Sequence, residues 1–490
     1  MTARWLDFLA IAAYMTALVS LGLRFSRRQT STERYFVAKR SIPGWAAGMS
    51  LLATLISSVT FIAYPGSAYD GNWSNLTPGL MVPVVLLLVG AYVIPFYRRT
   101  VGASCYEYFG KRFGYETRVY ATIAYAAGHF SKMGLVFYLL ALTVSGMTGW
   151  DTALLIVLVG FATVAYTLAG GIEAVVWADV VQGFVLWIGI AVCLGYLLFL
   201  PPGGPSAALA AAWHSGKISL GSSAFDLHKP TILVLSIYGF FYYLQRYTAD
   251  QTVVQRYLVA TSDRGALRGV ALGSLLCIPV WTFFMLIGTL CWTFFYSVRE
   301  PLPGYIHKAD QVFPYFITTH IPPGLAGLFL AALFGAAMAN ISSDLNSLAA
   351  IAVQDYYAVW RPASADRLRL RVAKIAVAIS GSVCIAVALV LARSNGTALS
   401  LWYSISAVVA GGLAGLFLLA FFVPKAGRAA ALVGIGASLI FTIWATATKF
   451  PWHNYMIGAI AHVVLLAVGW LYSLALPICP ATNDLTRTAD

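Results

Sequence analysis

The feature that most constrains this chain is its succession of long apolar runs. A helix needs about 20 mostly apolar residues to cross a hydrocarbon core of about 30 Å, and thirteen such runs follow one another. The chain is 60% hydrophobic and 10% charged, well outside the range of soluble domains. We therefore expect an all-α polytopic membrane protein with about 13 transmembrane helices. The runs are residues 5–23, 43–69, 78–97, 119–148, 151–168, 174–200, 230–249, 265–297, 311–355, 370–392, 398–423, 427–448 and 454–476.

Basic residues are unevenly distributed among the connections between these runs. Of 31 Lys and Arg, 23 lie in alternate connections or in the C-terminal tail, seven lie in the other connections, and Lys132 falls inside a run. This is the positive-inside pattern, and it rejects nucleic acid as the partner that explains the net charge of +13. It predicts a multi-pass protein of the plasma (inner) membrane with an outside N-terminus and a cytoplasmic C-terminus.

Cysteine and histidine residues form no pattern that indicates a metal centre or a disulfide framework. The six cysteines have no paired spacing, and the seven histidines show neither His-x-x-x-His nor Glu-x-x-His spacing. No nucleophile and base pair is apparent either. We therefore expect a protein that is not an enzyme and whose function resides in the lipid bilayer.

Two segments have the composition of broken membrane helices. Residues 50–66 read SLLATLISSVTFIAYPG and residues 236–245 read SIYGFFYYLQ, and both place polar residues and glycine inside apolar runs. Transporters built from inverted repeats break the first helix of each repeat at the midplane, where freed backbone binds ions and substrate. The alternative is that these small residues permit close helix packing.

A carboxylate and a hydroxyl-rich segment lie within other runs. Asp179 sits in a long apolar helix, where a charge costs roughly 2.5 to 3.5 kcal/mol on insertion scales. Residues 336–347 read AAMANISSDLNS and concentrate side-chain oxygens of the kind that a sodium ion takes. The two features indicate ion handling. The alternative for Asp179 is a structural hydrogen bond, either to cap a helix or to the neighbouring Trp177.

Three motifs together resemble the sodium:solute symporter family. They are GGIEAVVWADVVQ at residues 170–182, the segment 336–347 that ends in LNS, and DQTVVQRYL at residues 250–258. The resemblance covers residues 5–476 and implies a LeuT-like fold with a five-plus-five inverted repeat. It also implies one membrane domain over 1–490, with an extra N-terminal helix at 5–23, repeats at 43–200 and 230–423, and extra C-terminal helices at 427–476.

The same resemblance implies sodium as the coupling ion, bound at two sites. The family's common site would use carbonyls of Ala53, Ile56 and Ala336, but its two serine hydroxyls fall at Ala339 and Asn340. With that departure, the site is altered, weak or absent. An additional site, similar to one in the sialic-acid branch, would use Asp179, Ser342 and Ser343, which all match.

Substrate ligands are expected on three helices that the resemblance places around a central cavity. They are Ser57, Ser58, Thr60, Tyr243, Gln245, Tyr403 and Ser404. Lys132 lies where the sialic-acid branch has an arginine that contacts the substrate carboxylate. The alternative for Lys132 is a lysine that reaches an aqueous face or pairs with a neighbouring carboxylate.

These features predict a sodium-coupled symporter that imports a small organic solute. An organic anion, such as sialic acid or another carboxylate, is slightly favoured over a neutral sugar, mainly because of Lys132 and also because Thr60 replaces a glutamine of the sugar branch. A sugar symporter remains one alternative. A transporter-like membrane sensor or channel without coupled transport is another, supported by the departures at Ala339 and Asn340.

Overall fold

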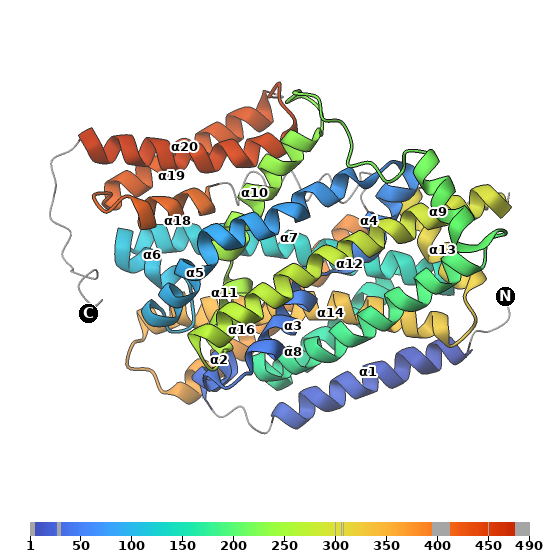
Figure 1. Ribbon diagram of the computed structural model, residues 1–490. Coiled ribbons are helices and arrows are strands. Elements are labelled where there is room, and N and C mark those ends of the chain that lie inside the picture. Colours follow the sequence, from blue (N-terminus) through green and yellow to red (C-terminus); the bar gives the residue numbers. More distant parts are fainter. Residues whose placement is uncertain are drawn as a thin grey trace.

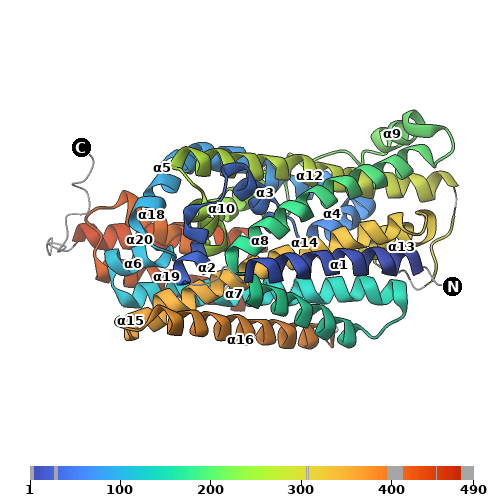
Figure 2. The same cartoon turned by 90° about the horizontal axis from the view of Figure 1, so that it is seen from below.

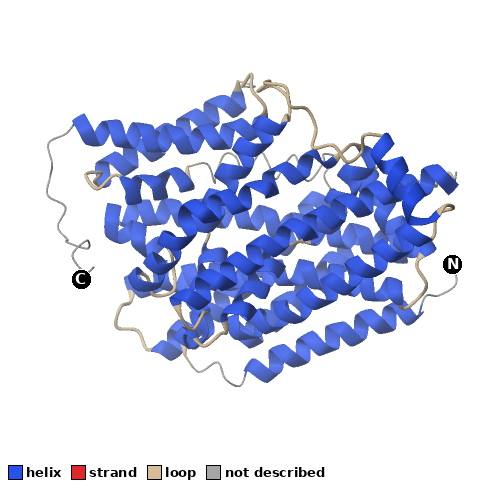
Figure 3. Ribbon diagram, in the orientation of Figure 1, coloured by secondary structure: helices blue, strands red, loops and turns tan. Residues whose placement is uncertain are grey.

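The computed structural model describes residues 5–26, 31–298, 300–304, 306, 308–393, 412–448 and 450–475. This part of the chain consists of helices and connecting loops without a strand (Figure 3). The long helices run side by side in one elongated bundle, as two perpendicular views show (Figures 1 and 2). Each of the thirteen predicted runs overlaps a helix, so the predicted all-α class is confirmed.

The first half of the chain forms the helices α1 (Trp5–Ser26), α2 (Thr32–Val37), η1 (Ala38–Arg40), α3 (Gly44–Leu55), α4 (Ser58–Asp70), η2 (Trp73–Met81), α5 (Val82–Thr100), α6 (Tyr106–Phe113), α7 (Tyr115–Thr148), α8 (Thr152–Phe199) and α9 (Gly204–His214). The second half forms α10 (Ile232–Ala249), α11 (Gln251–Val259), α12 (Asp263–Val298), η3 (Ala309–Gln311), α13 (Val312–His320), α14 (Leu325–Ile351), η4 (Ala352–Tyr357), α15 (Ala358–Trp360), α16 (Asp366–Ala392), α18 (Leu413–Phe422), α19 (Arg428–Ala447) and α20 (Asn454–Ala475).

Several of these helices are long and apolar enough to cross a membrane. Within the described residues there are eight, or nine if the bent pair α3 and α4 is one span. Shorter apolar helices cover Trp5–Leu18, Thr152–Leu168 and Leu413–Phe422. The predicted runs 151–168 and 174–200 are the two arms of α8, which bends at Gly171, where φ is 56° and a residue with a side chain would be strained.

The second predicted run is broken, as expected. Helices α3 and α4 meet at an angle of 56° across Ile56 and Ser57. The proline and glycine at 65–66, by contrast, lie inside α4, which continues to Asp70. The break therefore falls at the hydroxyl-rich centre of the segment.

The second break lies at a different place from the predicted segment 236–245, which is continuous helix within α10. The chain leaves the helix at Asp250, whose φ/ψ of −99°/114° is extended, and re-enters it in α11. Asp250 stabilises the new start, because its side chain accepts hydrogen bonds from the amides of Thr252 and Val253. Gly239 serves close packing instead: a Cβ there would lie 2.5 Å from the Cα of Pro78.

Helix α14 forms the centre of the bundle. Its residues from Phe329 to Ile351 are buried, and it packs against α1, α3, α7, α8 and α16. On the far side of α3, close contact with α12 depends on glycines: a Cβ on Gly48 would lie 2.4 Å from the carbonyl oxygen of Gly269. These contacts hold α3 between α14 and α12.

The connections between the long helices lie at the two ends of the bundle. Helices α9 and α13 lie at the end where α1 begins, while α2, α6 and α15 lie toward the other end (Figure 2). Three arginines that the charge count assigned to basic connections, Arg98, Arg246 and Arg256, are instead buried. Without these three, the bias becomes 20 (23 minus 3) against seven.

Candidate functional site

The break between α3 and α4 frees backbone carbonyls inside the bundle. In a continuous helix the amide of Ser57 would bond to Ala53, but here it faces the Thr60 hydroxyl oxygen at 3.5 Å. The amide of Thr60 donates to the carbonyl of Ser57 at 2.9 Å and so does not serve Ile56. The carbonyls of Ala53 and Ile56, two predicted sodium ligands, are therefore not used by the helix.

Asn340 of α14 faces this break. Its side-chain amide donates to the carbonyl of Thr54 at 2.5 Å, and the residue is 2% exposed. Its Oδ1 makes no hydrogen bond within the described part of the chain. Buried polar atoms normally have a partner, and carbonyl and amide oxygens are ligands that hard cations take. The donor set therefore fits a cation at this position.

The other two predicted ligands of the common site, Ala336 and Ala339, precede Asn340 on the same buried helix. Ala339 offers no side-chain oxygen, and its carbonyl accepts the hydroxyl of Ser342 at 3.1 Å. The structure thus brings the broken end of α3 and the predicted segment of α14 together. Of the two residues that stand at the serine positions, Asn340 supplies a side-chain oxygen and Ala339 does not.

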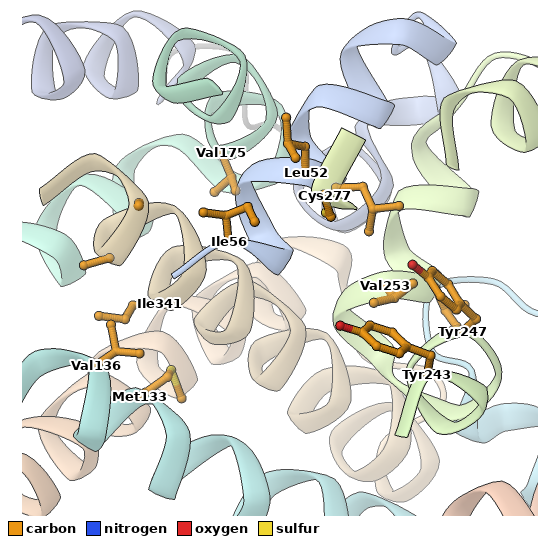
Figure 4. Packing of buried hydrophobic residues seen from close by; sticks show 14 of the residues in the cluster. Leu52, Ile56, Met133, Val136, Val175, Tyr243, Tyr247, Val253, Cys277 and Ile341 are labelled. Carbon is orange, nitrogen blue, oxygen red and sulfur yellow. The ribbon is translucent and has the colours of Figure 1, made fainter. Parts of the chain in front are cut away.

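Helices α7 and α8 border the break as well as α14. Ile56 lies beside Val175 of α8, and Ile341 of α14 lies near Val136 of α7 (Figure 4). The hydroxyl of Ser58, the first residue of α4, donates to the carbonyl of Val136 at 3.4 Å. The face of α7 that carries Val136 therefore borders the break.

Asp179 lies in a fully buried polar cluster beside Ser50 of α3. Its Oδ2 accepts the hydroxyl of Ser50 at 2.6 Å and lies 3.3 Å from Nη2 of Arg256, and neither charged side chain is exposed. Arg256 also donates to the hydroxyl of Ser343, which lies 3.2 Å from that of Thr54. The Oδ1 of Asp179 has no hydrogen-bond partner among the described residues.

The predicted set Asp179, Ser342 and Ser343 is therefore partly assembled. Arg256 bridges Asp179 to Ser343, while the hydroxyl of Ser342 turns to its own helix. The sequence prediction missed Arg256 as the counter-ion. The signal was present in the motif at 250–258, whose arginine falls inside a buried helix rather than in a connection.

Lys132 of α7 is paired within the protein. Its Nζ lies 2.6 Å from Oδ2 of Asp344 on α14, and the lysine side chain is 14% exposed while the aspartate is not exposed. Oδ1 of Asp344 accepts the hydroxyl of Thr252 at 3.0 Å. Pairing with a carboxylate was the alternative expected for Lys132, but the sequence does not identify Asp344 as the partner.

A second carboxylate extends this network to the break at Asp250. The ring of His129 lies between the two acids, with Nδ1 2.9 Å from Oδ1 of Asp344 and Nε2 3.2 Å from Oδ2 of Asp250. Arg246 forms an ion pair with the same Asp250 oxygen. A chain of charged groups thus connects α7, α14 and the junction of α10 with α11.

The pair of Lys132 and Asp344 lies one helical turn from the α3 break. Lys132 precedes Val136 by four residues on α7, and Asp344 follows Asn340 by four residues on α14, so each shares a helix face with a residue at the break. One turn is about 5.4 Å. The ammonium of Lys132 therefore lies about one turn from the carbonyl and amide oxygens at the break.

The remaining predicted substrate residues divide into three groups. Ser57, Ser58 and Thr60 lie at the start of α4 beside the break. Tyr243 of α10 packs against Trp281, with ring centroids 5.9 Å apart. Trp281 in turn stacks with Tyr64, which lies one turn beyond Thr60 on α4. Gln245 is half-buried on α10. Tyr403 and Ser404 lie outside the described residues.

Sequence comparison places this arrangement among known proteins. A family model described as "Sodium:solute symporter family" matches residues 35–437. The sodium/sialic acid symporter NanT of Aliivibrio fischeri is 31% identical, over 95% of this chain and 92% of its own length. The sodium/sialic acid symporter SiaT of Proteus mirabilis is 32% identical, over 89% and 88%. The human sodium/iodide cotransporter is 28% identical, over 86% of this chain and 66% of its own.

Comparison with solved structures leads to the same family of proteins. A Na⁺-coupled sialic acid symporter in a substrate-bound outward-open state superposes with a TM-score of 0.90 at 30% identity, covering 96% of this chain and 98% of that protein. The nucleobase-cation-symport-1 transporter Mhp1, at a TM-score of 0.62 and 15% identity, shares the fold. The fold is therefore LeuT-like.

Proposed function

The chain belongs to the sodium:solute symporter family, and we propose that it imports a small organic anion together with sodium ions. Sialic acid is the first candidate. Two relatives at 31% and 32% identity are sodium/sialic acid symporters, and the structure superposes on another such protein over nearly its whole length. Other carboxylates belong to the same chemical class.

One observation carries the proposal: unused oxygen ligands lie one helical turn from a buried lysine. The carbonyls of Ala53 and Ile56 and the Oδ1 of Asn340 suit a cation. Lys132 would meet an anion, because its side chain carries a positive charge and remains 14% exposed beside Asp344. Symport needs both sites in one protein and close enough to interact, and this arrangement provides them.

For sodium we propose two positions. The first is the common site of the family, with backbone oxygens of Ala53, Ile56, Ala336 and Ala339 and the side chain of Asn340. The second is at Asp179 with Ser342 and Ser343. Because Arg256 contacts the Oδ2 of Asp179, we propose the unpartnered Oδ1 as the sodium ligand there.

For the substrate we propose a binding site at the break, between α4, α7 and α10. Lys132 would meet the carboxylate, and polar groups would hold the rest of the molecule. The proposed residues are Ser57, Ser58, Thr60, Lys132, Tyr243, Gln245, Tyr403 and Ser404.

Sodium would drive import through differential binding to two states. Sodium binding would favour the outward-open state, and the substrate would then close the outer side. The membrane potential contributes about 2.3 kcal/mol per sodium charge per 100 mV. The protein would move its substrate without chemical conversion.

We propose that the molecule is one plasma-membrane domain with its N-terminus outside and its C-terminus in the cytoplasm. Its two repeats would be 43–200 and 230–423. In support, each repeat begins with an interrupted helix, α3 with α4 and α10 with α11.

Uptake by proteoliposomes tests the proposed function. A panel of labelled solutes would include sialic acid, monocarboxylates, hexoses and amino acids, each with an inward sodium gradient or with choline in place of sodium. We expect accumulation of a carboxylate that depends on sodium. Equal uptake in choline, or preference for neutral sugars, would reject the proposal.

A further inference from the structure

We propose that Asp344 couples the anion to sodium by exchanging partners: its carboxylate pairs with Lys132 before substrate binds and holds a sodium ion afterwards. This inference rests on the proposed function and specifies how one buried acid would link its two ligands. Asp344 is a different residue from the proposed ligands at Asp179, Ser342 and Ser343.

Lys132 and Thr252 contact different oxygens of Asp344. The two charged atoms are 2.6 Å apart, and Lys132 contacts only the Oδ2 oxygen of the carboxylate. Thr252 holds Asp344 through the other oxygen, Oδ1. Loss of the lysine would therefore leave the aspartate in place, with Oδ2 free.

An anionic substrate would cause that loss. Its carboxylate would compete with Asp344 for Lys132, whose side chain keeps 14% of its surface exposed. The other strong cation of the network, Arg246, is already paired with Asp250. Asp344 would then keep His129, 2.9 Å from its Oδ1, but its buried Oδ2 would have lost its cation, which is unfavourable unless another cation arrives.

The neighbouring side chain indicates where that cation would bind. Asn340 lies four residues before Asp344, on the same face of α14, and its buried Oδ1 has no hydrogen-bond partner among the described residues. The amide nitrogen of Asn340 donates to Thr54, which directs the oxygen elsewhere. A sodium ion between Oδ1 of Asn340 and Oδ2 of Asp344 would satisfy both atoms.

The same position explains a departure from the family. Where the common site has two serine hydroxyls, this chain has Ala339 and Asn340, and one side-chain oxygen is missing. A carboxylate one turn further along α14 would supply the missing ligand once Lys132 has left it. Sodium and the lysine ammonium would exclude each other, because both are cations at the same oxygen.

Coupling then follows from charge alone. The anion removes the lysine from the sodium ligand, and sodium removes the competitor of the anion. Each ligand raises the affinity of the other by the same factor, as linkage requires.

The test measures sodium-dependent thermal stabilisation of the purified full-length protein, with choline chloride keeping the ionic strength constant and no substrate added. Lys132→Met should lower the sodium concentration for half-maximal stabilisation by at least about fivefold, since typical couplings are 5- to 150-fold. Lys132→Met combined with Asp344→Asn should return it to the wild-type value or above. An unchanged midpoint in Lys132→Met overturns the inference.

Asp355→Asn is the matched control. Asp355 is also a buried acid next to the C-terminal end of α14, paired with Arg118, and its replacement should leave the sodium midpoint unchanged. A lowered midpoint in this control as well would show a general loosening of the protein and would also overturn the inference.

A second measurement uses binding of labelled N-acetylneuraminic acid. Sodium should tighten binding to the wild type at least about fivefold and should tighten binding to Asp344→Asn less than about twofold. Full sodium dependence in Asp344→Asn contradicts the coupling role. If sodium fails to stabilise even the wild type, the proposed sodium coupling itself is wrong, which is a distinct outcome.

Discussion

The guanidinium of Arg256 lies 3.3 Å from the carboxylate of Asp179, and both side chains are fully buried. A carboxylate that the sequence marks as a sodium ligand thus has a permanent cation on one oxygen. Its second oxygen has no hydrogen-bond partner among the described residues. Asp179 therefore combines a structural role with the proposed role in sodium binding, and the two roles can be separated by mutation.

The first prediction separates these roles. Asp179→Asn should raise the sodium concentration needed for half-maximal uptake and should also lower stability, by about 3 to 5 kcal/mol, because Arg256 loses its partner. Asp179→Asn combined with Arg256→Met should recover much of the stability but none of the sodium affinity. Thermal melting and sodium activation curves measure both. Normal sodium activation in Asp179→Asn would reject the site.

The second prediction concerns the missing hydroxyl of the common sodium site. Ala339→Ser restores a side-chain oxygen beside Asn340 and should lower the sodium concentration for half-maximal uptake several-fold. A glycine at the same position adds no oxygen and serves as the control. If serine and glycine shift the sodium curve equally, the site does not bind sodium.

The third prediction concerns Lys132. Lys132→Met should abolish binding of an anionic substrate while sodium still stabilises the protein, because the sodium ligands lie on other helices. Lys132→Arg should keep part of the binding, since the charge remains although the planar fork has another geometry. Intact anion binding in a destabilised Lys132→Met protein would show that the lysine serves only Asp344.

The fourth prediction concerns orientation. A cysteine at Ser223, in the exposed connection before α10, should react with an impermeant maleimide from outside intact cells, and one at Ala365, before α16, should not. The background is favourable because Cys105, Cys193, Cys277, Cys291 and Cys384 are buried, and Cys479→Ser removes the remaining thiol. The reverse labelling pattern would overturn the proposed topology.

The sequence predicted the helices and the first break because both depend on local composition. Apolar runs give membrane-length helices, and hydroxyl residues in the middle of one run indicate the interruption at Ile56 and Ser57. The second break was misplaced, because Gly239 looks like a helix breaker but serves close packing against Pro78. The actual break depends on the N-cap at Asp250, which lies just outside the predicted segment.

The ion pairs could not be predicted in the same way. Lys132 and Asp344, like Asp179 and Arg256, are far apart in the sequence, and their pairing depends on how α7, α8, α11 and α14 pack. Composition identifies a charge at membrane depth but not its partner. Asp344 in particular stood inside the quoted segment 336–347 without a role, although it is a charged residue in a buried helix.

The most direct test of the account is accumulation against a gradient. Proteoliposomes would be loaded with unlabelled N-acetylneuraminic acid at the external concentration, and an inward sodium gradient would be applied together with an inside-negative potential. The account predicts net accumulation of the labelled anion above its external level, lost when choline replaces sodium and absent in Lys132→Met. Exchange without net accumulation, or accumulation that persists in choline, would contradict sodium-coupled import.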